Sequence, residues 1–200
     1  MEQMTELASR ADNLQDHLGR YLGPIAASWQ RPSRVGEPSV QLLRFDNKPS
    51  KGLTTMTTLG LSKFALRSRS GTQFRQELVL SCGDCANGAK VKPLLDLVAD
   101  ELITEGRALS RGDLLGPHGP LIPGAEVTAL YATIPVFYPS AFAQWNGSTP
   151  PTIFVQLIPI TTDEAELRRK REPEEFEKYL EMADPDVFDF ARRSTLLSNG

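Results

Sequence analysis

Two cysteines that lie three residues apart are the side chains with the clearest potential for chemistry. Cys82 and Cys85 stand directly after a stretch with strand character and shortly before one with helix character. A cysteine near the start of a helix can have a lowered pKa, and the thiolate is the form that attacks disulfides. The pair therefore makes thiol-disulfide exchange a candidate function.

The residues that follow the pair argue against this function. A thioredoxin-like helix begins at the first cysteine, whereas here Asn87-Gly88 breaks the chain directly after Cys85. The helix is therefore expected to start near Lys90, and the ordinary interpretation of Cys82 and Cys85 is two small residues in a strand-to-helix loop. A thiol-disulfide oxidoreductase that uses this pair is the alternative function, and it is not the leading one.

Other patterns that would indicate catalysis are absent from the sequence. His17 and His118 are its two histidines, and they fall in a predicted outer helix and a distant glycine-proline loop, where they could not complete a zinc site with the cysteines. There is no Gly-x-Ser-x-Gly elbow and no glycine-rich loop followed by Lys-Ser or Lys-Thr. We therefore expect a protein that is not an enzyme and that has no cofactor and no metal.

The composition fits one compact domain over residues 1–200, because 40% of the 200 residues are hydrophobic and 24% are charged. The net charge of -3 gives no basic face for nucleic acid, so we expect no nucleic-acid partner. The first residues lack the apolar stretch of a secretory signal, and no apolar run approaches the length of about 18 residues that a membrane span needs. These features predict a cytoplasmic protein with no membrane partner.

The element around which the chain is organised is a strand at 74–80 and the helix after it. Apolar and polar residues alternate in the strand, where Leu78 and Leu80 point one way while Glu77 and Val79 point the other, so we expect a half-buried strand. The following helix is predicted from apolar residues at helical spacing, and Gly106 is expected to end it. These apolar residues are Val91, Leu94, Leu95, Val98 and Leu102.

The remaining segments complete an α+β pattern. A helix is expected within residues 1–22, because apolar residues share one helical face up to the terminator Gly23-Pro24. Charged helices are expected within 161–196, where Thr161 and Glu164 have the spacing of a capping box. Strands are predicted at 25–29, 40–45, 53–59, 127–134 and 152–160, the last of them buried on both faces. Loops are predicted at 63–71, 110–126 and 135–151.

Two of these loops carry side chains that are suited to recognition. Aromatic residues dominate the energetics of protein interfaces, and arginines can serve an acidic partner. The alternative for the aromatic loop is that it packs on the core, and the ordinary role of loop arginines is to be solvated. The candidate contacts with a partner are Phe137, Tyr138, Phe142 and Trp145 in the loop at 135–151, and Arg67 and Arg69 in the loop at 63–71.

The order of several short motifs resembles the suppressor of fused family in its short bacterial form. The similar segments are Thr-Leu-Gly-Leu-Ser at 58–62, Gln-Glu-Leu-Val-Leu at 76–80, the helix at 93–99, Gly-Asp at 112–113, the strand and helix start at 154–164 and Asp-Phe-Ala-Arg-Arg at 189–193. The resemblance covers most of residues 53–193 and corresponds to the N-terminal half of the animal protein.

The resemblance implies a mixed, mostly antiparallel sheet flanked by helices, and a binding domain rather than an enzyme. In animals, proteins of this family hold a transcription factor inactive by enclosing a short peptide as an added strand. Bacterial relatives are regarded as immunity-type proteins associated with toxins. The partner implied for this chain is therefore a protein, either a toxin or a regulatory protein, which the chain would bind and neutralise.

Overall fold

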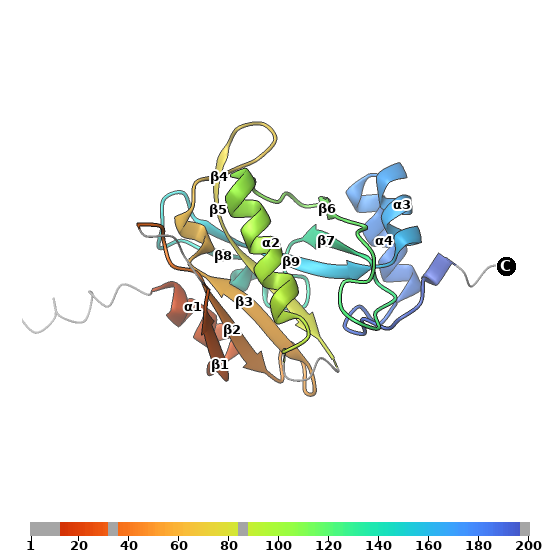
Figure 1. Ribbon diagram of the computed structural model, residues 1–200, viewed down its shortest axis with the longest axis horizontal. Helices are drawn as coiled ribbons and strands as arrows, with labels where there is room; N and C mark the ends of the chain where they lie inside the picture. Colours follow the sequence, from red (N-terminus) through yellow and green to blue (C-terminus); the bar gives the residue numbers. More distant parts are fainter. Residues whose placement is uncertain (1–12, 32–35, 84–87, 197–200) are drawn as a thin grey trace, which may run out of the picture.

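The computed structural model describes residues 13–31, 36–83 and 88–196, and nine strands within these ranges form one mixed sheet (Figure 1). The path across the sheet runs through β1 (Ala27–Gln30), β2 (Gln41–Asp46), β3 (Thr54–Leu59), β5 (Gln73–Cys82), β9 (Thr152–Ile160), β7 (Ala129–Thr133) and β6 (Leu114–Leu115). Two short strands lie off this path, β4 (Leu66–Arg67) beside β5 and β8 (Gln144–Trp145) beside β9. β5 and β9 run parallel, and the other described pairs are antiparallel. The predicted α+β fold with a mixed, mostly antiparallel sheet is confirmed.

The centre of the sheet is formed by β5 and β9. Residues 76–82 of β5 are all buried, so the half-buried strand predicted at 74–80 is wrong. The polar residue Glu77 indicates a solvent-facing side opposite Leu78 and Leu80, but Glu77 and its neighbour Gln76 both have partners inside the fold. Gln76 Nε2 donates to Leu109 O at 2.5 Å, and Leu109 N donates to Gln76 Oε1 at 2.9 Å. The prediction that β9 is buried on both faces is confirmed.

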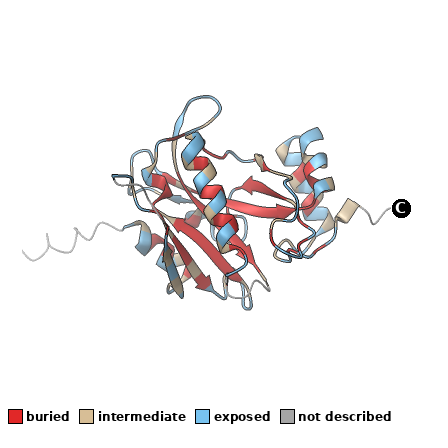
Figure 2. Cartoon of the chain, in the orientation of Figure 1, coloured by how far each residue is buried: buried red, intermediate tan, exposed pale blue. Residues whose placement is uncertain are grey.

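Different helices cover the two faces of the sheet. α2 (Lys92–Glu105) packs on the face that carries Leu78 and Leu80, and Figure 2 shows buried and exposed residues alternating along this helix. α1 (Leu14–Leu22) and the 3-10 helix η3 (Ser140–Ala143) pack on the face that carries Val79. The helix predicted within residues 1–22 is confirmed at 14–22, while residues 1–12 lie outside the described residues.

Helix ends follow the local signals in the sequence. The expected end of α2 is confirmed, because Gly106 is its C-cap with a φ of 60° and its N–H donates to Leu102 O and Ile103 O. The capping box at the start of α3 (Thr162–Lys170) is also confirmed. Thr161 N donates to Glu164 Oε2 at 3.0 Å, and Glu164 N donates to Thr161 Oγ1 at 3.4 Å.

The charged helices predicted within 161–196 are α3 and α4 (Pro173–Ala183), which cover the far end of β7 and β9 (Figure 1). The chain from 184 to 196 forms turns that return across the ends of the strands. Gly83 N donates to Phe188 O at 2.9 Å, and Glu126 N donates to Phe190 O at 3.0 Å. None of the helices in the described ranges is long and apolar enough to span a membrane.

Candidate functional site

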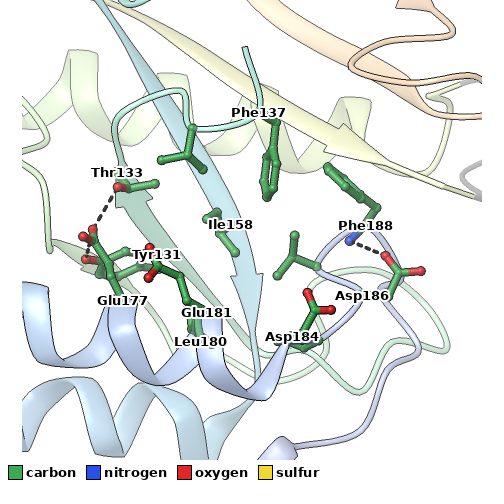
Figure 3. Close-up of a pocket in the computed structure, with 13 residues that line it drawn as sticks. Tyr131, Thr133, Phe137, Ile158, Glu177, Leu180, Glu181, Asp184, Asp186 and Phe188 are labelled. Carbon is green, nitrogen blue, oxygen red and sulfur yellow. Dashed lines mark hydrogen bonds between the residues drawn. The ribbon is translucent and has the colours of Figure 1, made fainter. Parts of the chain in front are cut away.

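A cleft of about 610 Å³ lies between α4, the turns after it and the far end of the sheet (Figure 3). Side chains of β7 and β9 form its floor, and segment 133–137 and segment 184–188 form two of its walls. The walls come from parts of the chain that are distant in sequence, so the cleft exists only in the folded protein.

The lining of the cleft is largely apolar. The rings of Phe137 and Phe188 lie with their centroids 4.8 Å apart, Ile158 lies between the walls, and Leu180 enters from α4 (Figure 3). Large apolar side chains at the cleft are also unusually exposed, with Val136 at 55% and Phe137 at 39%. The adjacent Ile134 is 56% exposed. An exposed apolar cluster beside a concave surface is typical of an interaction site.

One end of the cleft is closed by hydrogen bonds to the Glu177 carboxylate. Tyr131 Oη donates to Glu177 Oε1 at 2.7 Å, and Thr133 Oγ1 donates to the same oxygen at 3.0 Å (Figure 3). Arg111 Nε donates to both carboxylate oxygens at 3.1 Å. Partial burial by itself would raise the pKa of Glu177, but these hydrogen bonds outweigh it and hold the pKa below its ordinary value. Burial and the Glu177 charge raise the pKa of Tyr131.

We expect Glu177→Gln to lower the free energy of unfolding by about 1 kcal/mol at pH 7, because Arg111 loses one of its two carboxylate partners at a partly exposed site. A depressed pKa in the folded state stabilises the fold above the unfolded-state pKa, and this contribution is lost as the pH falls through the folded-state pKa. The difference between wild type and variant should therefore shrink as the pH is lowered from 7 into the acid range, as measured by urea unfolding across that range. Glu181→Gln, on the same helix, is the control with no expected effect, and a difference that does not shrink in acid would contradict the charge argument.

The rim of the cleft is acidic. Glu181, Asp184 and Asp186 line it and are exposed, and none of the three has an ion-pair partner among the described residues. Asp186 Oδ1 accepts a hydrogen bond from Phe188 N at 3.0 Å, which holds the wall in place (Figure 3). The described lining contains no histidine, cysteine, serine or lysine.

The structure separates the aromatic residues that the sequence proposed as one group of contacts. Phe137 lines the cleft, but Phe142 is fully buried and its ring stacks on Phe154 with centroids 4.8 Å apart. Tyr138 is partly buried, and its hydroxyl group lies 2.8 Å from the hydroxyls of Thr55 and Ser81. Burial raises the pKa of Tyr138. Phe142 therefore belongs to the core, and the prediction that it contacts a partner is wrong.

The other candidate contacts lie away from the cleft. Trp145, in β8, is partly buried against the cluster under α1. Arg67 in β4 and Arg69 in the hairpin between β4 and β5 are exposed and do not line the cleft; Figure 1 shows this hairpin at the top of the view. Arg67 Nη1 donates to Gly71 O at 3.1 Å, and Arg69 Nη2 lies 3.2 Å from Asp113 Oδ1.

The cysteine pair receives no support as an active site. Cys82 is 1% exposed and is disulfide-bonded, and Cys85 lies outside the described residues. In the part of the chain that the structure describes, no group of three or more histidine, cysteine or acidic side chains is arranged to hold a metal ion.

The mixed sheet, the helices on its two faces and the cleft at its far end define an α+β domain. A family model described as Suppressor of fused protein (SUFU) matches residues 36–193. This chain therefore belongs to the suppressor of fused family, as the sequence motifs predicted. No curated protein matches the sequence at a significant level.

Solved structures of similar fold come from the same family. A suppressor of fused homolog from Neisseria gonorrhoeae has a TM-score of 0.70 and 17% identity, over 91% of this chain and 92% of that chain. A Sufu-Fu complex gives a TM-score of 0.63 and 15% identity, over 91% of this chain and 90% of that chain. Drosophila Suppressor of Fused gives a TM-score of 0.58 and 14% identity, over 86% of this chain but 42% of that chain. At these identities the likeness establishes the fold.

Proposed function

We propose that this chain is a non-enzymatic protein-binding domain whose partner contacts the cleft beside α4. The observation that carries the proposal is the concentration of exposed large apolar side chains at 134–137, on the wall of a concave surface. Exposed apolar side chains are costly unless a partner covers them, and a buried aromatic anchor gives an interface much of its binding energy. The family supports the same function, because one similar structure is a complex of Sufu with Fu.

We further propose that binding neutralises the partner, in an immunity-type or regulatory role in the cytoplasm of a bacterium. A domain without its own chemistry acts on a partner by covering a surface or by holding one conformation. Arg67 and Arg69 form a separate exposed basic pair, which we keep as a proposed second contact for an acidic part of the same partner. Adding the purified chain to an activity assay of the partner tests neutralisation. Activity that is unchanged at saturating chain would leave binding in place and reject neutralisation.

Phe137→Ser should weaken capture of the partner from the source organism by at least about tenfold, since a central aromatic anchor often contributes about 2 kcal/mol. The matched control is Leu97→Ser, which removes another exposed apolar side chain, 64% exposed on α2 and outside the cleft. Quantitative mass spectrometry of proteins retained by the immobilised wild type and the two variants is the measurement. Circular dichroism and urea unfolding first establish that both variants fold.

The expected result is one stoichiometric partner that wild type and Leu97→Ser retain and that Phe137→Ser loses. Equal retention by all three proteins would remove the cleft from the interface. If Leu97→Ser and Phe137→Ser lose the partner equally, the binding surface is not the one proposed.

A further inference from the structure

We propose that the cleft recognises a peptide segment of the partner in which an apolar side chain is flanked by lysine or arginine. This inference rests on the proposed function and specifies the chemistry of the partner at the same site. It combines two features of the cleft, an apolar interior and an acidic rim.

The interior fits apolar side chains. Ile158 and Leu180 lie on one side of a space whose other side is formed by Phe137 and Phe188 (Figure 3). Val187 also lines this space. Its volume of about 610 Å³ lies in the usual range for binding pockets, roughly 300–1,000 Å³, so a side chain and the backbone next to it can enter. The Phe137 and Phe188 rings are tilted by 57° to each other and expose ring edges and faces that suit an aliphatic or aromatic group.

The rim adds a preference for positive charge. Elsewhere on α4 the acidic side chains have arginine partners, as Glu174 and Glu177 have Arg111 and Glu175 has Arg171. The pairing includes Glu177 at one end of the cleft but does not extend to the rim, where the exposed side chains Glu181, Asp184 and Asp186 lie without a described cation within ion-pair distance.

Charge complementarity therefore identifies the class of occupant. No described lining residue is basic, so a bound segment would meet negative charge at the rim on leaving the apolar interior. An acidic or phosphate-bearing occupant would be repelled there, whereas lysine or arginine next to the buried side chain would be attracted. Because the rim is exposed, each charge pair should change affinity by a small factor and should matter mainly for specificity.

A phage-displayed library of random dodecapeptides, selected on the immobilised full chain, tests this inference without knowledge of the natural partner. Selected sequences should be enriched in lysine or arginine within two positions of Phe, Leu, Ile or Val. A synthetic peptide of the consensus sequence should bind about fivefold more weakly to Glu181→Lys than to wild type. Glu166→Lys makes the same charge change at an exposed position of α3 outside the cleft, and it should bind the peptide as wild type does.

Each outcome of this selection bears on the inference. Enrichment of basic-apolar sequences together with weaker binding to Glu181→Lys alone supports it. If the selected peptides are apolar, lack basic residues and bind at Phe137, the preference for lysine or arginine is overturned, but the proposed function stands. Equal weakening by Glu166→Lys and Glu181→Lys would overturn the assignment to the cleft. If an alkylammonium probe such as octylamine binds and no peptide is selected, the occupant of the cleft would be a small amine and not a peptide. If the chain self-associates and Glu181→Lys abolishes the self-association, the occupant would be a second copy of this chain.

Discussion

Replacing Arg192 by methionine is expected to lower the free energy of unfolding by about 3–5 kcal/mol, because the buried Glu164 carboxylate would lose its cation. Arg192 Nη2 donates to Glu164 Oε2 at 2.6 Å and Arg192 Nη1 donates to Glu164 Oε1 at 2.7 Å. Both side chains are buried, and Arg192 Nη2 also donates to Pro159 O at 3.0 Å. Burial by itself would raise the pKa of Glu164, but the contacts with Arg192 outweigh it and lower the pKa.

Urea unfolding of Arg192→Met, Glu164→Gln and the double variant measures this effect as a double-mutant cycle. The double variant should be more stable than the sum of the single changes predicts, because it leaves no buried charge without a partner. Arg193→Met, at the exposed neighbouring position, should change the stability by less than about 0.5 kcal/mol. Equal losses of unfolding free energy in Arg192→Met and Arg193→Met would contradict the stabilising role of the buried ion pair.

The same ion pair also sets a pH dependence. A carboxyl group whose pKa is depressed in the folded state stabilises the fold above its unfolded-state pKa, and the contribution is lost as the pH falls through the folded-state pKa. The deficit of Arg192→Met should therefore be present at neutral pH and shrink in acid. Arg192 anchors the segment that continues from the wall of the cleft, so we also expect faster amide exchange at Phe188 in this variant.

Glu77→Ala is expected to cost about 4 kcal/mol, because it leaves several buried donors without an acceptor. The fully buried Glu77 carboxylate accepts from Thr58 Oγ1 at 2.6 Å and from the backbone N–H groups of Gly60, Leu61 and Ser62 at 2.8, 3.3 and 3.1 Å. Burial raises the pKa of Glu77, and these hydrogen bonds act in the opposite direction. The carboxylate holds the turn from β3 into the 3-10 helix η2 (Leu61–Lys63), which leads to the hairpin that carries Arg67 and Arg69.

Glu77→Gln is the informative companion, because it keeps an acceptor oxygen and should cost about half as much as Glu77→Ala. Amide hydrogen exchange at residues 60–62 should become faster in both variants, and more so in the alanine variant. If amide exchange becomes faster equally throughout β5 and not preferentially at residues 60–62, the Glu77 carboxylate does not hold this turn in place.

Local patterns in the sequence predicted most of the secondary structure, because helix ends depend on nearby residues. Gly106 ends α2 and the Thr161 and Glu164 pair starts α3, as the residue types and spacing indicated. The burial of β5 could not be predicted in the same way. The alternation of apolar and polar residues predicts one solvent-exposed face. In the structure, however, the Glu77 carboxylate accepts hydrogen bonds from a turn that begins 17 residues earlier in the chain.

The cleft was only partly predictable for a related reason. Phe137 was identified as a candidate contact from its aromatic loop, but the opposite wall at Phe188 comes from a distant segment with no local signal of its own. The same loop also contains Phe142, whose burial against Phe154 depends on how the loop folds back under α1. Composition can suggest that a loop contacts a partner, but tertiary packing decides which of its aromatic side chains remain available.

Site-specific photocrosslinking at the cleft tests the binding role most directly. p-Benzoyl-L-phenylalanine would replace Phe137 in one protein and Leu97 in the other, both expressed in the source organism, and cross-linked products would be identified by mass spectrometry. We predict one dominant partner protein cross-linked from position 137 and absent from position 97, with the cross-linked stretch carrying lysine or arginine beside an apolar residue. No cross-linked protein at position 137, or the same products from both positions, would contradict the account.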